Sequence, residues 1–530
     1  MSTVTILLLA AAAGYGIAKY LRLPGVPLLV LAGVALTVFG AIPDEELHYQ
    51  VLLLGLAFLV FVVGTELNPR RVGRHGKVVL LVGLAQFFTL GAVGLAIALG
   101  LGFELVVSLY LALAVTASST LVVVTLLRQR QQFFEPFGRV TLGVLLLQDV
   151  LVIFFISSLS RAGEGLGASM MALGGTVLLF GLAVVFLRWV TPWLLLHLKL
   201  DEETVLLTVL SILFIFVGLA YLMGLPPVTG AFLAGFSLSA FPVQGIIRGQ
   251  LTSLADFFLA VFFVALGAAL TIPTARELLL VGLLAMVVLT LTPPLVAWVA
   301  QQVGLNTRAS IESGLLLAQC SEFSIVVALI GVAQGHIDEG KMAVIVLMTV
   351  VTMILTPFVA TDRNTWRLMR LVPSSRMEPE SSRLHQGHVI LIGFGTNARK
   401  MAERLQKENQ TVVVVDDDPG IVARAREMGL EAVRGDGASG EVLARAGASR
   451  ARLVISTMRR VADNETLLRR LGGVPVYTLI FDPGDARRLR TLGAVPVLYS
   501  EAAAEDFRQW YEEAGPGSDG HRERPAGAQS

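Results

Sequence analysis

The sequence has few charged residues, which soluble proteins have in larger numbers, and almost no cysteine, which many secreted proteins use for disulfides. Only 15% of its 530 residues are charged, against roughly 25% in an average soluble protein. Cys320 is its single cysteine, which excludes an intrachain disulfide. The net charge of +1 gives no indication of a nucleic-acid partner. What the chain has in excess is hydrophobic residues, 55% in all, and residues 1–360 are long apolar runs separated by short polar connections.

These runs predict a polytopic membrane domain over residues 1–361. A membrane span needs about 20 mostly apolar residues. No lysine or arginine precedes the first run, so we interpret it as a span and not as a cleaved signal peptide. Thirteen spans are predicted, at 3–20, 25–42, 51–67, 78–101, 104–127, 139–160, 168–197, 204–223, 225–241, 252–271, 276–303, 309–333 and 341–361.

The lysines and arginines of the connections predict an N-terminus outside and a C-terminal region in the cytoplasm, because basic residues favour the cytoplasmic side. The alternate connections then divide unevenly, twelve basic residues inside against three outside. Inside are Lys19, Arg22, Arg70, Arg71, Arg74, Lys77, Arg128, Arg130, Arg139, Lys199, Arg248 and Arg308; outside are Arg161, Arg276 and Lys341. We therefore expect a multi-pass protein of the cell (inner) membrane, and the odd span number favours an inverted-repeat transporter.

The sixth predicted span contains an acid, Asp149, preceded by Gln148 and flanked by apolar residues on both sides. An acid at the centre of a span costs roughly 2.5–3.5 kcal/mol on insertion scales, so it needs a compensating role. A desolvated carboxylate holds a proton near neutral pH, and a bound cation would expel that proton. Asp149 is thus a candidate for a site at which cation and proton compete. The alternative is a structural carboxylate bonded to a neighbouring helix.

Polar interruptions occur in the fifth and twelfth spans. Residues 114–124 align without gaps to residues 318–328, at an offset of 204. Interruptions at corresponding places in two halves indicate broken helices whose ends face a bound ion; the alternative is that the small residues only permit close packing. Glu322 would open the second half of its helix at the positive dipole end, either to pin the break or to take part in transport. The polar residues concerned are Thr116, Ser118, Ser119 and Thr120 in the fifth span, and Gln319, Ser321 and Glu322 in the twelfth.

Taken together, these motifs resemble those of the Kef-type branch of the cation:proton antiporters. The resemblance covers about 350 residues, and Cys320 replaces a glycine of the family pattern. The matching segments are Phe61–Pro69, Ala117–Thr120, Gln148–Asp149, Gly230–Gly235, Phe262–Gly267 and Gln319–Phe323. The resemblance implies that Asp149 binds the ion beside Gln148, that Glu66 of the first motif supports the helix breaks, and that a homodimer works by an elevator-like movement.

The Gln148–Asp149 pair also bears on stoichiometry. Related electrogenic sodium antiporters have two adjacent aspartates and a membrane-buried lysine. Here Gln148 is neutral, and no charge occurs between Leu278 and Thr307 in the eleventh span. One titrating carboxylate would carry one proton one way and one cation the other. We therefore expect electroneutral 1:1 exchange, with K⁺ favoured over Na⁺ from the Kef resemblance.

After a polar linker at 362–386, residues 387–513 predict a soluble Rossmann-like α/β domain. A buried strand is followed by Gly393, Gly395, Thr396 and Asn397 at a turn that opens a helix, an arrangement that lets a pyrophosphate approach the backbone. Asp416 ends the next strand 23 residues after Gly393, near the spacing of the acid that bonds a ribose hydroxyl. Asp417 and Asp418 are expected to be solvated turn residues. Further strands are predicted at 431–436, 452–456, 474–480 and 495–498, and a disordered tail at 514–530.

This domain resembles the nucleotide-binding lobe (RCK, or TrkA-N) of domains that regulate potassium transport, and the resemblance adds Asp436 as a contact to adenosine. We expect a regulatory adenine nucleotide: NAD(H), AMP or ATP. The histidines form no metal-ligand pattern, and His48, His75, His197 and His336 fall in connections or at a span end. Two alternatives remain. A nucleotide-gated K⁺ channel would need a selectivity filter, and a membrane-anchored NAD-dependent oxidoreductase would need catalytic groups; the sequence shows neither, so we expect no enzyme.

Overall fold

The structure, a computed structural model, describes residues 3–21, 24–39, 45–67, 76–130, 136–197, 202–239, 257–271, 273–305, 307–369, 386–458 and 460–501, with 504 and 508. The predicted tail at 514–530 and His75 lie outside these residues, as do the side chains of His48 and His197. The chain divides into two compact units, Met1–Val372 and Pro373–Ser530.

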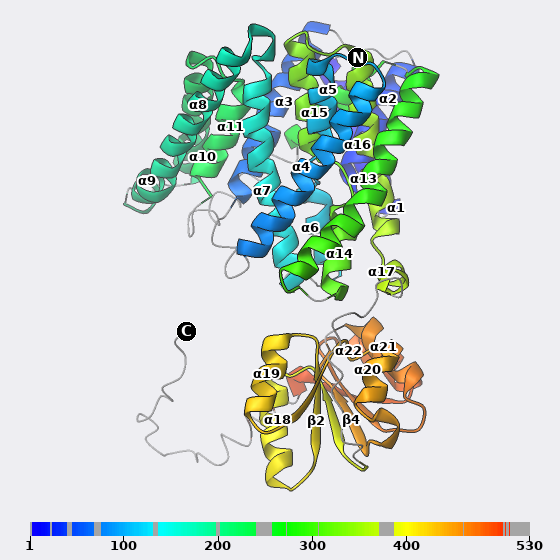
Figure 1. Cartoon of the computed structure of the whole chain (residues 1–530). Coiled ribbons are helices and arrows are strands. Elements are labelled where there is room, and N and C mark those ends of the chain that lie inside the picture. The colour runs from blue at the N-terminus through cyan, green and yellow to red at the C-terminus, as the bar shows by residue number, and fades with distance from the viewer. Residues whose placement is uncertain are drawn as a thin grey trace. The chain divides into compact units, whose positions relative to one another are not determined.

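The first unit is a bundle of helices (Figure 1). Its α-helices are α1 (Thr3–Leu21), α2 (Gly25–Val38), α3 (Glu45–Glu66), α4 (Gly76–Gly100), α5 (Leu105–Ala114), α6 (Thr120–Gln129), α7 (Pro136–Leu159), α8 (Leu166–Val185), α9 (Thr191–His197), α10 (Glu202–Leu222), α11 (Pro227–Ser237), Phe257–Ala268, α13 (Ala275–Gln302), α14 (Thr307–Leu317), α15 (Glu322–Ala333), α16 (Glu339–Val359) and α17 (Asp362–Met369). Two short segments, η3 (Ala162–Glu164) and η4 (Phe186–Val190), connect helices. Helix α17 lies within the residues predicted as a linker.

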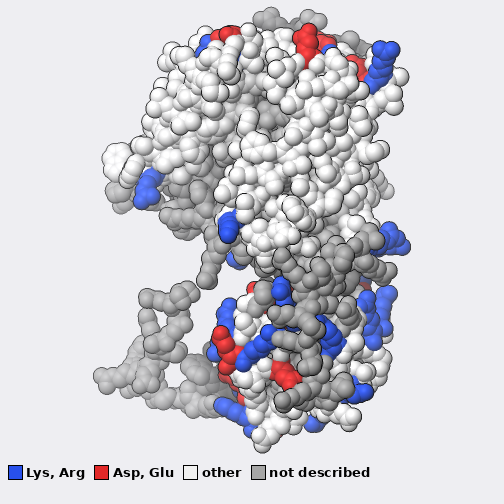
Figure 2. All heavy atoms as spheres, viewed as in Figure 1, with Lys and Arg blue, Asp and Glu red and all other residues white. Residues whose placement is uncertain are grey.

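The predicted spans are confirmed as helical segments. Among the described residues, seven segments are long and apolar enough to cross a membrane, and six shorter apolar helices occupy the remaining predicted spans. In the hydrocarbon layer a helix satisfies its own backbone hydrogen bonds, which explains why the apolar runs fold this way. On the face shown in Figure 2, charged side chains of this unit gather toward its two ends and leave the middle almost bare.

The fifth and twelfth spans are broken, as predicted. Helix α5 ends at Ala114 and α6 begins at Thr120; α14 ends at Leu317 and α15 begins at Glu322. The side chains of Ser119 and Ser321 cap the second halves by accepting hydrogen bonds from Val122 N and Phe323 N. These caps are 202 residues apart, so the ungapped alignment at an offset of 204 was wrong by two residues at the helix starts.

Glycines bring two pairs of helices into backbone contact. A Cβ atom on Gly64 of α3 would lie 2.3 Å from Phe232 O, and one on Gly235 of α11 would lie 2.0 Å from Phe61 O. The helix Phe257–Ala268 crosses α2 in the same way, because a Cβ on Gly267 would lie 2.0 Å from Val30 O and one on Gly33 2.0 Å from Val264 O. Close packing of membrane helices requires such small residues, which explains the glycines that end two of the sequence motifs.

The seventh predicted span is irregular. Helix α8 passes into the π-helical turn η4 before α9 begins at Thr191. Pro192 has no backbone N–H, so the carbonyl of Arg188 loses its usual partner and the helix widens locally. The Thr191 hydroxyl donates to Ser237 O at 3.0 Å and fixes this turn against the end of α11.

The second unit contains a parallel sheet with helices on both faces (Figure 1). Its strands are β1 (Val389–Ile392), β2 (Val412–Asp416), β3 (Glu431–Arg434), β4 (Leu453–Ser456), β5 (Val476–Ile480) and β6 (Ala494–Leu498), in the order β3-β2-β1-β4-β5-β6. The helices are α18 (Thr396–Lys407), α19 (Pro419–Glu427), α20 (Gly440–Arg445), α21 (Val461–Arg470) and α22 (Pro483–Thr491), with the turn η5 (Ala448–Arg450).

Alternate residues of these strands enter two separate cores. Leu391 and Val414 pack with α18 and α19, whereas Ile390, Ile392 and Val415 pack with α20, α21 and α22. Burial on both faces explains why β1 and β2 read as unbroken apolar runs. The strand order reverses between β1 and β4, which is where ligands bind in open sheets of this kind.

Candidate functional site

The first candidate site surrounds Asp149 at the middle of α7. Its side chain is 1% exposed. Thr120, the first residue of α6, donates its hydroxyl to Asp149 Oδ2 at 3.3 Å. The other oxygen, Oδ1, has no hydrogen-bond partner among the described residues. The structure therefore brings the predicted carboxylate to the break between α5 and α6 and leaves one of its oxygens available.

Ser118 connects this helix break to α7 and to the other break. Its backbone N–H donates to Gln148 Oε1 at 3.1 Å. Its hydroxyl donates to Leu317 O, the last carbonyl of α14, at 2.7 Å. A reciprocal bond runs from the Ser324 hydroxyl to Ala114 O, the last carbonyl of α5, at 2.5 Å. The last carbonyl of each first half-helix thus accepts a hydrogen bond from a serine of the other broken span. The last carbonyls of a helix have no donor within the helix, and these serines provide one.

Glu322 begins α15, as predicted, and is 3% exposed. Its Oε1 accepts the Ser119 hydroxyl at 2.6 Å and its Oε2 accepts the Ser321 hydroxyl at 3.3 Å. Glu322 thereby joins the two second half-helices. Glu66, the last residue of α3, is half-buried and lies within electrostatic range of both Asp149 and Glu322.

The remaining predicted residues make local contacts. The Thr116 hydroxyl donates to Leu113 O at 2.7 Å and not to another site residue. Gln319 Nε2 donates to Leu316 O at 3.2 Å, and Gln319 Oε1 has no partner among the described residues. Cys320 N donates to the Thr352 hydroxyl of α16 at 3.0 Å, which holds the break in place.

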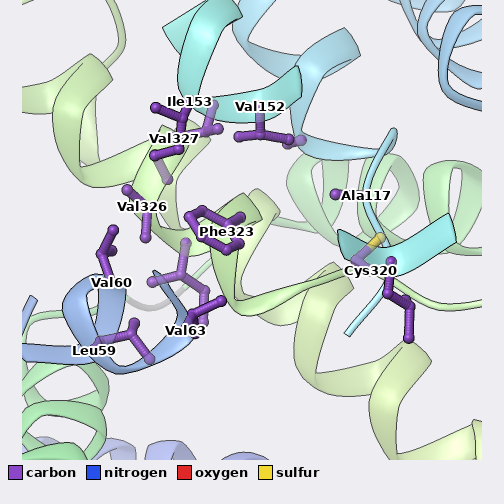
Figure 3. Packing of buried hydrophobic residues seen from close by; sticks show 14 of the residues in the cluster. Leu59, Val60, Val63, Ala117, Val152, Ile153, Cys320, Phe323, Val326 and Val327 are labelled. Carbon is purple, nitrogen blue, oxygen red and sulfur yellow. The ribbon is translucent and has the colours of Figure 1, made fainter. Parts of the chain in front are cut away.

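Apolar side chains surround the breaks. Figure 3 shows Phe323 of α15 between residues of α3 and residues of α7, with Cys320 and Ala117 at the breaks beside it. The Phe323 ring also meets Phe232 of α11 edge to face, with 5.9 Å between centroids. This packing keeps bulk water away from the polar groups of the breaks and strengthens their electrostatic interactions.

Sequence reasoning missed three features of this unit. Gln86 of α4 is 1% exposed and bonds to Ser118 and to Leu317 O; a single glutamine inside a long apolar run was the available signal. Arg308 and Glu312 form a buried ion pair of 3.0 Å on α14, and their spacing of four residues on a span was the signal. His336, in a predicted connection, lies half-buried with its Nδ1 3.0 Å from the Tyr110 hydroxyl.

The second candidate site lies where β1 passes into α18. Gly393 has a φ of +81°, and a Cβ there would lie 2.5 Å from Thr457 Oγ1, so this position requires glycine. Gly395 is the N-cap of α18 and a Cβ there would meet nothing within 4 Å, which leaves its backbone open to a ligand. Thr396 and Asn397 begin the helix, and their side chains lie outside the described set. The turn fits a phosphate at a helix N-terminus.

Asp416 ends β2 and is 9% exposed. Its Oδ2 accepts Phe394 N at 2.7 Å and its Oδ1 accepts Asp418 N at 2.9 Å, so it already holds the glycine turn against β2. Each oxygen keeps a second lone pair, which a ribose hydroxyl could use. Desolvation raises the pKa of Asp416, and these backbone donors partly offset the rise.

Asp417 and Asp436 complete an acidic group at this edge of the sheet. Asp436 Oδ1 accepts Ala438 N at 2.8 Å in the turn after β3. The pKa of Asp417 is raised to about 7, first by desolvation and then by the charges of Asp416 and Asp436. The Asp417 side chain is also exposed, so solvent screens part of this effect. Asp418 caps α19 by accepting Gly420 N at 2.7 Å. Asp417 is thus an exposed residue of the bend after β2, as expected, whereas Asp418 is exposed and also has a structural role as the cap of α19.

The fold and these contacts define a membrane transporter with a fused Rossmann-like domain. The family model "Sodium/hydrogen exchanger, transmembrane" matches residues 4–361, and a TrkA-N domain model matches residues 389–500. The chain belongs to the sodium/hydrogen exchanger family and carries a C-terminal TrkA-N domain. It is a multi-pass cation:proton antiporter, not an enzyme, and the channel and oxidoreductase alternatives are set aside.

The chain is similar to several solved structures, and the first of these supports the helical fold. The sodium proton antiporter MjNhaP1 from Methanocaldococcus jannaschii is 17% identical, matches 70% of this chain and 99% of its own, and has a TM-score of 0.55. The TrkA-N domain of inner membrane protein ybaL from Escherichia coli is 19% identical over 24% of this chain and 97% of its own, with a TM-score of 0.23. An NAD(P)-binding domain of an exopolyphosphatase-related protein from Archaeoglobus fulgidus is 18% identical over 24% of this chain and 99% of its own, with a TM-score of 0.23.

Proposed function

We propose that this antiporter exchanges K⁺, with Na⁺ as the second candidate, for protons in a 1:1 ratio, that Asp149 binds the cation and the proton alternately, and that a nucleotide in the TrkA-N domain regulates the exchange. The observation that carries the proposal is the buried carboxylate of Asp149. Thr120, which begins the second half of a broken span, bonds one of its oxygens, and the other oxygen has no hydrogen-bond partner among the described residues.

The site supports alternate binding in simple electrostatic terms. An ionised Asp149 in apolar surroundings needs a positive partner, because burying an uncompensated charge is costly. A proton satisfies this need by neutralising the carboxylate, and a monovalent cation satisfies it by pairing with the ionised form. Both cannot occupy Asp149 together. Gln148, Thr116, Ser118, Ser119 and Thr120 would provide neutral ligands, and Glu322, Ser321, Gln319 and Glu66 would support the breaks.

The regulatory part of the proposal rests on the glycine turn and the acidic group beside it. The backbone at Gly393 and Gly395 would receive the phosphates of NAD(H), AMP or ATP, and Thr396 and Asn397 begin the helix whose N-terminus faces them. Asp416 would bond the ribose and Asp436 would contact the adenosine. Binding there would bias the transporter through a coupling free energy between two sites.

The family resemblance extends the proposal to assembly and orientation. We infer a homodimer in the cell (inner) membrane, an elevator-like movement of the core helices, an N-terminus outside and the 387–513 domain in the cytoplasm. Light scattering of the purified protein in detergent measures the oligomeric state, and a cysteine-accessibility assay on intact cells measures the orientation.

Exchange in proteoliposomes tests the central claim. A pH-sensitive dye inside the vesicles should report proton movement when K⁺ or Na⁺ is added outside, and Asp149→Asn should abolish it because the amide cannot bind and release the proton. Glu339→Gln, at an exposed carboxylate that begins α16, is the matched control and should exchange like the wild type. Proton exchange that survives in a folded Asp149→Asn protein overturns the proposal.

Addition of NAD⁺, NADH, AMP or ATP to the same vesicles tests regulation. A change in exchange rate that disappears on Gly395→Val would support it, since the branched side chain would block the backbone of the turn. An exchange rate indifferent to every nucleotide would contradict it.

A further inference from the structure

Gln86 is a buried amide on α4, a continuous helix that packs against α5 and α7. It is 1% exposed, with apolar neighbours in the sequence. Its Nε2 donates to the Ser118 hydroxyl oxygen at 3.1 Å and to Leu317 O at 3.4 Å. Gln86 therefore contacts both helix breaks at once, through the residue that also holds Gln148.

The chemistry of its partners fixes which way the amide faces. The Ser118 hydroxyl already donates its proton to Leu317 O at 2.7 Å, so toward Gln86 it can only accept. Leu317 O is a carbonyl and also only accepts. The NH₂ group of Gln86 must therefore face Ser118 and Leu317, and its Oε1 must face the other way. That Oε1 is buried and has no hydrogen-bond partner among the described residues.

The buried Oε1 of Gln86 destabilises the protein unless a donor or a cation binds its lone pairs. Leaving a buried acceptor without a partner costs about 1–3 kcal/mol. Two more buried oxygens around the breaks share this condition, Asp149 Oδ1 on α7 and Gln319 Oε1 in the twelfth span. Carbonyl oxygens hold K⁺ in protein filters by replacing its hydration shell, and the amide oxygen of Gln86 is an oxygen of this kind.

We propose that Gln86 is a ligand of the transported cation, with its Oε1 as a neutral oxygen on α4 that completes the coordination begun by Asp149. This deepens the proposed function and rests on it. A proton needs only the carboxylate, whereas a cation needs several oxygens. Gln86 therefore sets the affinity for the cation and leaves the affinity for the proton unchanged.

The test separates the two affinities. Gln86→Met keeps the length of the side chain and removes the oxygen. In proteoliposomes it should raise the KM for K⁺ by about tenfold or more, the effect of losing roughly 1.4 kcal/mol of binding, while the proton concentration for half-maximal rate stays as in the wild type. Gln302→Met, at the exposed end of α13, is the matched substitution and should change neither.

A structural role would give a different result. Gln86→Met also removes the hydrogen bonds to Ser118 and Leu317, so a residue that only pins the breaks would lower kcat and leave the KM for K⁺ unchanged, or would weaken both affinities together. Either outcome overturns the proposal.

Cation binding without transport keeps the inference separate from the proposed function. Added K⁺ should raise the unfolding temperature of the purified wild type in detergent, and the rise should shrink in Gln86→Met or in the shorter amide Gln86→Asn. If Asp149→Asn still exchanges protons, the proposed function fails. If Asp149→Asn is inactive and Gln86→Met keeps both the wild-type KM and the full K⁺-induced rise, only the role of Gln86 fails.

Discussion

The Ser119 hydroxyl donates to Glu322 Oε1 at 2.6 Å, and this bond joins the second halves of the two broken helices. Ser119 has a second task, since its oxygen accepts from Val122 N at 3.2 Å as the cap of α6. The buried Ser119 side chain thus caps the start of α6 and also donates a hydrogen bond to the carboxylate of Glu322 on the other broken span.

We expect Ser119→Ala to destabilise the membrane unit by about 1–3 kcal/mol, because it removes a cap and one donor to a buried carboxylate. Thermal unfolding of the purified protein in detergent measures the loss. Ser211→Ala is the matched control, since that exposed serine of α10 bonds to Leu207 O in its own helix. Equal unfolding temperatures for the two variants would contradict the role given to Ser119.

A substitution at Glu322 distinguishes support from transport chemistry. Glu322→Gln keeps an oxygen that can accept from Ser119, so we expect a folded protein that still exchanges protons in proteoliposomes at a reduced rate. Complete loss of exchange in a protein that unfolds at the wild-type temperature would instead assign Glu322 to the transport step.

The electrical character of exchange follows from the residues beside Asp149. Gln148 is neutral, and α13 contains no charged residue after Glu277. With one carboxylate to carry either ligand, we expect a K⁺ gradient to move protons without building a membrane potential. A potential-sensitive dye in the same proteoliposomes should remain silent, and valinomycin with K⁺ supplies the positive control. A dye response that follows proton movement would exclude 1:1 exchange.

The sequence predicted most of the site because the membrane makes polar residues conspicuous. Asp149 and Glu322 were recognisable as acids in apolar runs, and Ser119 and Ser321 lay in interruptions that the structure confirms as breaks. The nucleotide domain was predictable strand by strand, since its parallel strands are buried on both faces.

The features that escaped prediction depend on contacts between distant segments. The role inferred for Gln86 depends on its hydrogen bonds to Ser118 and Leu317, which lie 32 and 231 residues away in the sequence. The offset between the repeats was wrong because helix starts are set by their caps, and the first break is longer than the second. Asp416 could be placed at the end of β2, but its bond to Phe394 N required the fold.

The glycine crossings lead to a prediction about folding. Gly235→Ala would place a Cβ 2.0 Å from Phe61 O, a backbone atom that cannot move without shifting α3. We expect loss of folded protein, or a destabilisation of about 1–3 kcal/mol or more from overpacking. Gly218→Ala on α10 is the matched control, since its Cβ would meet nothing within 4 Å. Yield and unfolding temperature of the two variants should differ clearly, and similar values would show that α3 and α11 adjust easily.

Asp417 predicts a pH dependence of nucleotide binding. Its pKa is raised from the ordinary aspartate value of 3.8 toward 7, so a larger fraction of the carboxyl is neutral at pH 6 than at pH 8. Protonated Asp417 therefore contributes to the stability of the folded domain. This contribution is complete below the unfolded-state pKa and is lost as the pH rises toward 7. Ionisation also adds negative charge beside the site for a negatively charged ligand. We expect the affinity of the full chain for NAD⁺ to fall by about 1.5- to 5-fold between pH 6 and pH 8, a range set by screened charge interactions.

Calorimetric titration with NAD⁺ measures this effect, because the charge of NAD⁺ does not change between these two pH values. Asp417→Asn imitates the protonated state, so it should bind at pH 8 as the wild type does at pH 6. Asp485→Asn removes a charge in α22, beside β6 at the other edge of the sheet, and should keep the wild-type pH dependence. An affinity that rises with pH in the wild type, or a slope unchanged in Asp417→Asn, would show that another group titrates.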